Sequence, residues 1–301
     1  MKVCTTCHQH LPKDKFSKKQ WKLGANCLRK CISCVRIVSA NNNNRVASSL
    51  DSMSIEKVPS PSDKDLFKQP PQKEDCPICF IRMPSIITGH KYKSCCGKVI
   101  CSGCIYAVRR MSKGALCPFC RTPTHTSDRE MIKRNIKRID LDDHNAIYNV
   151  GCRYSNGTCG LPRVRAKALE LYLTAGELGC AYAYQSIGNA YLYGDGVQRD
   201  TKKAQHYWGL AAMMGHVEAR YNLGIFEKRA ENMERALKHW TISASSGDTK
   251  SLDRIKDLYT VGHATKDDYT TALRTYQAYL DEIRSDQRDE AATYDDMYKY
   301  Y

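Results

Sequence analysis

Cys76-Pro77-Ile78-Cys79 opens a stretch of 45 residues that holds eight of the 16 cysteines in this 301-residue chain. The other six cysteines of the stretch lie in three groups, Cys95-Cys96, Cys101-Ser102-Gly103-Cys104 and Cys117-Pro118-Phe119-Cys120. The residues between them are too polar to close the stretch by apolar burial. Two thiolates separated by two residues can bind one tetrahedral zinc ion, so the spacing predicts two zinc sites. A disulfide framework is the alternative, and we expect it less because no signal peptide opens the sequence.

These cysteines resemble those of the RING finger over about residues 75–121, and we place that domain at residues 75–124. In the family the pairs interleave, so the resemblance implies one zinc ion on Cys76, Cys79, Cys101 and Cys104 and another on Cys95, Cys96, Cys117 and Cys120. Lys98 stands where most RING fingers carry a histidine, which makes the match closer to the all-cysteine variant. His90 is the alternative ligand if adjacent cysteines cannot both reach the metal.

Residues 1–40 form a second candidate zinc module. Two further cysteine pairs are separated by 23 residues, a spacing common in ribbon-type and LIM-like zinc fingers: Cys4, Cys7, Cys31 and Cys34. Cys27 is treated as a spare thiol. We therefore expect three zinc ions, one here and two in the RING-like domain. The basic residues of this module suggest either a solvated surface or a nucleic-acid contact.

Composition and a capping motif predict the structure of the two segments on either side of the RING-like domain. Residues 41–74 contain four consecutive asparagines, several prolines and no sustained apolar period, so we expect a disordered linker. Residues 125–141 begin with a capping box in which the Ser127 side chain accepts from the Glu130 backbone N–H, so we expect a basic capped helix there.

A helical repeat fills residues 142–285. Ala168, Ala204, Ala236 and Ala272 recur at intervals of 36, 32 and 36 residues, each followed four residues later by an aromatic residue. An upstream glycine marks the first helix of three units: Gly151, Gly188 and Gly224. The units resemble Sel1-like repeats, relatives of the tetratricopeptide repeat, which implies four helix pairs stacked as a solenoid with a protein-binding surface. Residues 286–301 are expected to be a flexible tail.

The predicted fold class is thus multi-domain. Small zinc-stabilised α+β modules, an N-terminal Cys4 finger and a cross-brace RING, precede an all-α Sel1-like solenoid. Residues 1–141 carry 27 of the 47 Lys and Arg, and no apolar run is long enough for a membrane span. We expect no membrane partner and a cytoplasmic or nuclear location.

The RING resemblance implies an E3 ubiquitin ligase that holds a charged E2 enzyme in an attack-ready pose and performs no covalent chemistry itself. The family's E2 contacts map onto Ile78 and Pro118, with Phe119 beside them, and Arg121 would bridge E2 and ubiquitin. A substrate or adaptor would bind the solenoid. Two alternatives stay open: a zinc-stabilised scaffold without ubiquitin transfer, and a nucleic-acid-binding regulator that uses the basic half.

Overall fold

The computed structural model describes residues 2–3, 10–11, 61–71, 73–112 and 116–301. The chain divides into two compact units, Met1–Asp51 and Ser52–Tyr301. In the first unit, strands β1 (Lys2–Val3) and β2 (His10–Leu11) pair antiparallel. The predicted ligands of the N-terminal site and the spare thiol lie outside the described residues: Cys4, Cys7, Cys27, Cys31 and Cys34.

The cysteine-rich stretch folds as a small module, called the cysteine module from here on (residues 75–124). A 3₁₀ turn, η3 (Ile87–Gly89), leads into an antiparallel pair, β3 (His90–Lys93) and β4 (Lys98–Cys101), and helix α5 (Ser102–Ser112) follows directly. An isolated bridge closes each cysteine knuckle, Asp75 with Arg82 and Leu116 with Pro123. The knuckles are built alike because a residue with positive φ follows the second cysteine of each: Phe80 and Arg121.

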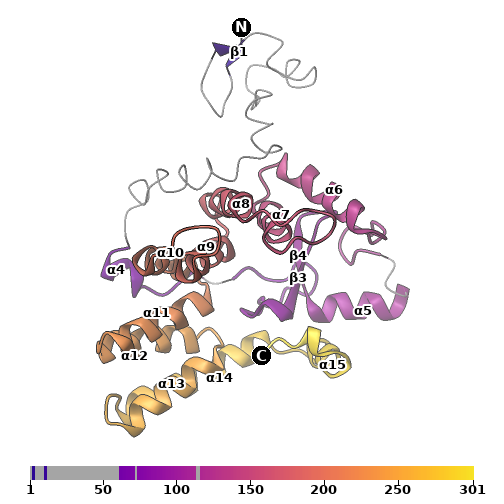
Figure 1. Ribbon diagram of the computed structural model, residues 1–301. Coiled ribbons are helices and arrows are strands. Elements are labelled where there is room, and N and C mark those ends of the chain that lie inside the picture. The colour runs from indigo at the N-terminus through magenta and orange to yellow at the C-terminus, as the bar shows by residue number, and fades with distance from the viewer. Residues whose placement is uncertain (1, 4–9, 12–60, 72, 113–115) are drawn as a thin grey trace. The chain divides into compact units, whose positions relative to one another are not determined.

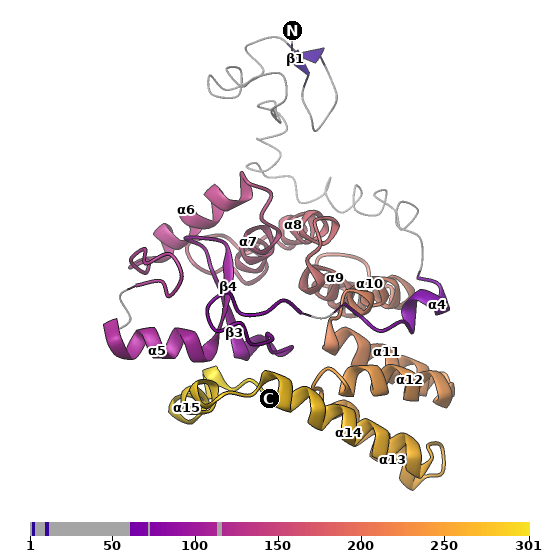
Figure 2. The same ribbon diagram turned by 180° about the vertical axis from the view of Figure 1, so that it is seen from behind.

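Helices make up most of the described residues that follow the cysteine module (Figures 1 and 2). Helix α6 begins after Ser127, whose hydroxyl accepts from the Glu130 N–H as predicted, although the Glu130 carboxylate caps the N–H of Thr126. The helices from α6 to α14 are α6 (Asp128–Ile139), α7 (His144–Asn156), α8 (Arg165–Glu177), α9 (Ala181–Tyr193), α10 (Thr201–Met213), α11 (Val217–Arg229), α12 (Met233–Ala244), α13 (Thr249–Thr260) and α14 (Lys266–Ile283). Consecutive helices from α7 to α14 pack as four antiparallel pairs.

The glycine and aromatic positions of the repeat meet inside each pair. A β-carbon at Gly188 of α9 would overlap the Trp208 ring of α10, and Gly224 of α11 stands in the same relation to Trp240 of α12. Both tryptophans are fully buried. The aromatic ring therefore fills the space that glycine leaves within its own helix pair, and the Trp208 ring also contacts the Phe226 ring of α11 in the next pair, with centroids 5.5 Å apart.

A residue that suits a helix N-cap stands four positions before three of the recurring alanines, namely Asp200, Asn232 and Asp268. Asp200 caps α10 by accepting from the Lys203 N–H, as expected. Asn232 makes no capping bond, because its amide donates to Glu227 instead. Thr265, not Asp268, is the N-cap of α14, and Asp268 closes the capping box from the third position.

Residues 61–71 form an ordered segment, although we expected the linker 41–74 to be disordered throughout. Helix α4 (Asp63–Leu66) packs against α10, and Figures 1 and 2 both show it at the edge of the repeats. Leu66 is buried, and Phe67 contacts His239 of α12. Contacts with the repeats order this segment, and such contacts cannot be predicted from composition alone.

Residues 286–301, expected to be a flexible tail, also form ordered structure. Helix α15 (Asp286–Tyr294) and the 3₁₀ turn η4 (Asp296–Tyr298) return to the cysteine module, where α15 lies beside α5 (Figure 1). Ala291 and Tyr298 join the buried core of the module, and Tyr300 is buried with Ile283. In residues 286–301 small and aromatic side chains are spread among charged ones, and for this reason the composition suggested a flexible tail.

Candidate metal centre

The eight cysteines of the module gather into two groups of four sulfurs. One group contains Cys76, Cys79, Cys101 and Cys104, and the other contains Cys95, Cys96, Cys117 and Cys120; within each group the sulfurs lie within 4.8 Å of one another. This is the interleaved grouping that the RING resemblance implies. His90, the alternative ligand, is in neither group.

The sulfur separations fit tetrahedral metal coordination. Cys76 and Cys104 are 3.9 Å apart and Cys79 and Cys101 are 3.7 Å apart, while the second group has Cys96–Cys117 at 4.0 Å and Cys95–Cys120 at 3.4 Å. A tetrahedron with zinc–sulfur bonds of about 2.3 Å has edges of roughly 3.8 Å. A disulfide needs about 2.05 Å, and none of the described cysteines forms one. Two all-thiolate sites for a soft divalent ion such as zinc are therefore compatible with this geometry.

Local backbone bonds hold each knuckle in position. In the first knuckle the Cys76 N–H donates to Ile81 O at 3.0 Å, and the Phe80 N–H donates to Cys76 O at 2.9 Å. In the second knuckle the Cys117 N–H donates to Thr122 O at 2.8 Å, and the Arg121 N–H donates to Cys117 O at 3.0 Å. These bonds fold each knuckle into a tight turn, and Cys76 and Cys117 are also part of the buried core of the module.

A buried arginine from the C-terminal helix lies against the first sulfur group. Arg288 of α15 is fully buried and donates to three backbone carbonyls, those of Ile81, Arg82 and Ile283. Its Nη2 is also 4.0 Å from the Cys79 sulfur. Four thiolates around one divalent ion carry a net charge of about −2, so a fixed guanidinium is a suitable neighbour.

Further contacts bring the C-terminal helix across the first sulfur group and α5. The Gln287 amide oxygen is 3.6 Å from the Cys104 sulfur, and the Arg109 guanidinium donates to the Tyr298 hydroxyl at 3.0 Å. Arg110 forms an ion pair with Glu290. The sequence reading missed these contacts because each joins residues that are 180 or more positions apart. The only local signal was the alternation of small, aromatic and charged residues after residue 285.

The opposite side of the cysteine module is anchored to the start of the repeats. The Asp143 carboxylate, which also caps α7, accepts from the Tyr92 hydroxyl and from Arg138 Nε, both at 2.9 Å. Burial and the Asp143 carboxylate raise the pKa of Tyr92 well above its usual value. The phenol therefore stays protonated and remains a donor over the physiological pH range.

Lys73 and His90 line the polar space between the module and α9, a cavity of about 610 Å³. Lys73 Nζ donates to Ser85 O and to the Tyr182 hydroxyl, both at 3.2 Å, and burial lowers its pKa to about 8. Burial, with the nearby Lys73 charge, lowers the pKa of His90 to about 4. His90 is therefore neutral at physiological pH.

The predicted E2-contact residues lie in or next to the two knuckles. Ile78 is half-buried and packs against the core of the module, whereas Phe119 is 44% exposed beneath Lys98 Nζ, which lies 5.8 Å from the ring centroid. Pro118 is half-buried, and Arg121 is exposed.

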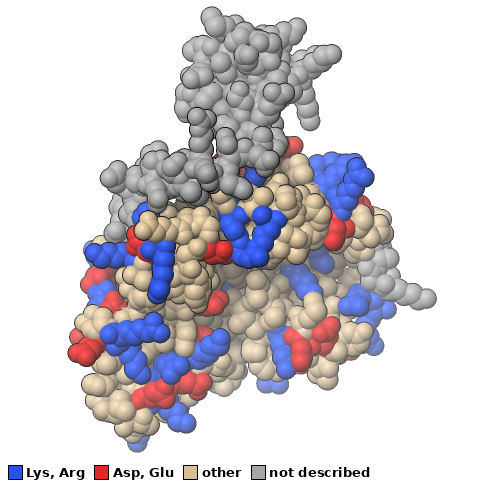
Figure 3. All heavy atoms as spheres, viewed as in Figure 1, with Lys and Arg blue, Asp and Glu red and all other residues tan. Residues whose placement is uncertain are grey.

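Helix α6, expected to be a basic capped helix, buries Ile132 and exposes Lys133 and Lys137. Figure 3 shows a group of basic side chains at this end of the face in view, while both signs alternate over the later helices.

Comparison with known proteins assigns the helical region. The Sel1 repeat family model matches residues 144–180, 181–216 and 217–248, which correspond to the first three helix pairs. Residues 144–248 are three Sel1 repeats. The fourth pair, α13 and α14, continues the same packing beyond the matched residues.

Two solved structures align with a large part of the chain. A Sel1 repeat protein from Oxalobacter formigenes is 24% identical, covering 55% of this chain and 64% of that one with a TM-score of 0.42. The c5321 antigen of uropathogenic Escherichia coli, which displays a Sel1-like repeat fold, is also 24% identical. That alignment covers 64% of this chain and 40% of the other, with a TM-score of 0.45.

Local sequence similarity points to two plant proteins. The E3 ubiquitin-protein ligase GW2 of Oryza sativa subsp. indica is 33% identical over 67 residues, which is 22% of this chain and 15% of that protein. The E3 ubiquitin-protein ligase DA2 of Arabidopsis thaliana is 34% identical over 62 residues, 20% of this chain and 14% of that protein. The chain thus spans only a small part of these curated relatives.

Within the described residues, no helix combines the length and the apolar character that a membrane crossing requires.

Proposed function

We propose that this chain is a RING-type E3 ubiquitin ligase in which the cysteine module binds a charged E2 enzyme and the Sel1 repeats recruit protein partners. The observation that carries the proposal is the interleaved pair of sulfur groups, which is the arrangement that the RING resemblance implies. Local similarity to two E3 ubiquitin-protein ligases supports it. The Sel1 repeats support the recruiting role, because stacked helix pairs present an extended protein-binding surface. The location that suits this role is cytoplasmic or nuclear.

In this proposal the protein acts by positioning. Zinc, when bound, cross-links the knuckles and takes no part in the transfer. Ile78, Pro118 and Phe119 would contact the E2, because two similar knuckles, Cys-Pro-Ile-Cys and Cys-Pro-Phe-Cys, present an apolar residue each. Arg121 would donate hydrogen bonds to E2 and ubiquitin together. Holding the thioester in an attack-ready pose raises the rate without a covalent step.

The test is discharge of ubiquitin from a panel of loaded E2 enzymes onto free lysine by the full chain. Arg121→Ala removes one or two charge-assisted hydrogen bonds, each worth about 1.5–3 kcal/mol. We therefore expect discharge to slow by about ten- to a hundred-fold while E2 binding persists. Ile78→Ala should weaken E2 binding itself. Arg129→Ala, at an exposed arginine on α6, is the matched control and should change neither quantity.

A non-catalytic scaffold is the second candidate, and one observation favours it. The buried core of the cysteine module includes side chains from α15 and from η4, so the module is packed together with the C-terminal end of the helical region. If the wild-type chain discharges no E2 in the panel, the scaffold function replaces the ligase function. If Arg121→Ala discharges as fast as wild type, the bridging role of Arg121 is wrong.

A further inference from the structure

A short segment of this chain packs against a surface of the Sel1 repeats, which is called the groove from here on. The segment is Pro61–Pro71, and the groove is formed by the side chains of α10, α11 and α12 that contact it. Leu66 is buried and Phe67 is half-buried, although they are the only large apolar residues between Pro61 and Pro70. Two apolar side chains in a charged segment are thus the ones that the repeats cover.

A buried arginine of the groove donates a hydrogen bond to the backbone of the segment. Arg220 of α11 is 2% exposed, and its Nη1 donates to the Leu66 carbonyl at 2.7 Å. Its Nη2 donates to Ala212 O of α10 at 2.8 Å, so a contact within the repeats sets the direction of the guanidinium. Burial lowers the pKa of Arg220 only to about 10, so the side chain stays charged at physiological pH. A fixed, buried donor of this kind suits a peptide carbonyl.

The aromatic residue of the segment lies in a cationic and aromatic setting. The Phe67 ring centroid is 4.8 Å from that of His239, and the Arg235 guanidinium lies 5.1 Å from the Phe67 centroid. Lys238 Nζ is 5.9 Å from the same centroid. All three partners come from α12. A cation over an aromatic face is attractive, and the effect grows as the pair is desolvated.

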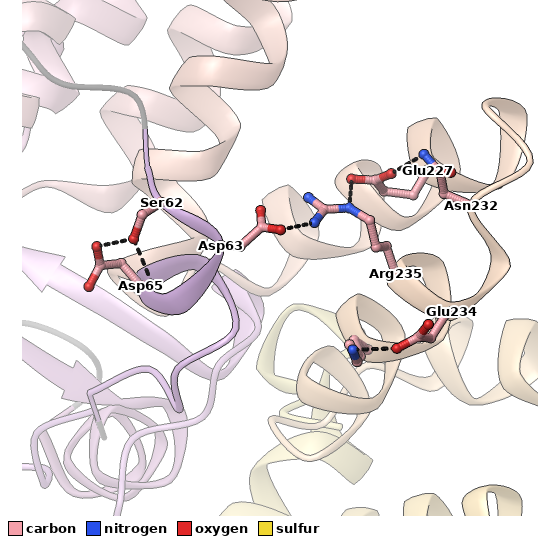
Figure 4. Close-up of polar contacts among 8 residues, drawn as sticks. Ser62, Asp63, Asp65, Glu227, Asn232, Glu234 and Arg235 are labelled. Carbon is pink, nitrogen blue, oxygen red and sulfur yellow. Dashed lines mark hydrogen bonds and ion pairs between the residues drawn. The ribbon is translucent and has the colours of Figure 1, made fainter.

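An acidic residue one turn before Leu66 completes the contact. Asp63 forms an ion pair with Arg235, which Glu227 holds from the other side at 2.8 Å (Figure 4). The Ser62 hydroxyl caps α4 by accepting from the Asp65 N–H. Prolines flank the turn on both sides: Pro61 lies against Gly209 of α10, and Pro70 and Pro71 lie against Gly215. The groove therefore contacts an acidic residue, the backbone of a leucine and a phenylalanine ring at positions 63, 66 and 67 of the segment.

We propose that this groove is the partner-binding site of the repeats, that it binds partner segments of the type Asp-x-x-Leu-Phe, and that residues 61–71 are its built-in competitor. The proposal deepens the recruiting role assigned to the repeats above and rests on it. Residues 61–71 belong to the same chain as the groove, so their effective concentration is on the order of millimolar. A partner must therefore bind well enough, or present enough copies, to displace them.

The direct test uses the full chain and a fluorescein-labelled synthetic peptide of residues 61–71. The double substitution Leu66→Ala/Phe67→Ala in the chain removes the two side chains that the groove covers, and the buried core of the repeats is untouched. Fluorescence anisotropy should show the peptide binding this variant at least ten-fold more tightly than the wild-type chain. The same peptide carrying Phe67→Ala should bind the variant at least ten-fold more weakly than the unchanged peptide.

A charge-reversal pair places the peptide in this groove. Arg235→Glu in the Leu66→Ala/Phe67→Ala chain should weaken binding of the unchanged peptide about two- to five-fold, as expected for an exposed ion pair. A peptide with Asp63→Arg should recover that loss. Arg254→Glu, at an arginine of α13 that pairs with Asp257, is the matched control and should have no effect.

Equal affinity for the wild-type and Leu66→Ala/Phe67→Ala chains would overturn the proposal, and so would equal affinity for the unchanged and Phe67→Ala peptides. The assay contains no ubiquitin or E2. Its failure therefore leaves the ligase proposal standing, and failure of E2 discharge leaves peptide binding standing.

Discussion

Arg288 is the residue that joins the end of the chain to the first sulfur group. Replacing it by Met keeps much of the side-chain volume but removes the Arg288 donor from the carbonyls of Arg82 and Ile283, while Ile81 O keeps the Cys76 N–H as a donor. Each unpaired buried group costs about 1–3 kcal/mol. We expect Arg288→Met to lower the free energy of unfolding by about 3 kcal/mol and to speed zinc release to a chromogenic chelator. Arg284→Met, at an exposed arginine paired with Asp289, should change neither. Similar zinc release from the two variants would show that Arg288 has no special relation to the sulfur group.

His239 makes the stability of the groove dependent on pH. In the part of the chain that the structure describes, neither ring nitrogen has a hydrogen-bond partner. Burial, then the charges of Arg220 and Arg235, lower its pKa to about 3, while the Asp63 carboxylate acts in the opposite direction. Above pH 6.5 the ring is neutral in both folded and unfolded chains and contributes nothing to the pH dependence. As pH falls below 6.5 the unfolded chain takes up the proton first, so stability decreases.

The expected loss for His239 is about 1 kcal/mol between pH 6.5 and 5.5. Urea unfolding of wild type and His239→Gln at pH 7 and 5.5 isolates this contribution, because the cysteines and the other buried histidines titrate in both proteins. His239→Gln should therefore lose less stability than wild type over this interval. An equal loss would mean that His239 is protonated in the folded chain.

At the scale of the helix pair, glycine and tryptophan act as one unit. A β-carbon at Gly188 would overlap the Trp208 ring, and overpacking of a core typically costs about 1–3 kcal/mol. Gly188→Ala should thus destabilise the repeats by that amount, despite the better helix propensity of alanine.

A double-mutant cycle tests the cause. In a Trp208→Leu background the ring is gone, so Gly188→Ala should cost little beyond the first substitution. Chemical unfolding followed by circular dichroism measures all four chains. If Gly188→Ala costs as much in the Trp208→Leu background as in the wild-type chain, the close approach of the two residues does not explain the glycine.

The elements that the sequence predicted well are those whose signal is local or periodic. Two-residue cysteine spacing predicts pairs of metal ligands, the RING resemblance implies which pairs share a site, and the recurring alanine at Ala168, Ala204 and Ala236 marks successive helix pairs. The segments that were mispredicted, 61–71 and 286–301, depend on single side chains meeting distant ones. Arg288 looks like an ordinary solvated charge until two of its carbonyl partners, more than 200 residues earlier, are known. Leu66 and Phe67 are too few to create a period, and their environment is set by residues far along the chain such as Arg220 and His239.

At the scale of the whole second unit, the chain closes on itself through its last sixteen residues. The cysteine module receives Ala291 and Tyr298 into its core, and the Tyr279 hydroxyl of α14 accepts from the Ser85 N–H at 2.7 Å. An isolated fragment of residues 70–141 would lack these contacts. Tests of the module therefore belong in the full chain.

Deleting residues 286–301 tests this closure. The deletion exposes apolar surface around Ile105 and Tyr106 and removes Arg288 from the first sulfur group. We expect faster zinc release, and hydrogen exchange of the α5 backbone at least ten-fold faster than in the full chain. Protection of α9 and α10 should persist, because their stability comes from neighbouring helix pairs. If α5 kept its protection after the deletion, residues 286–301 would be a tail that merely rests on the module, as their composition first suggested.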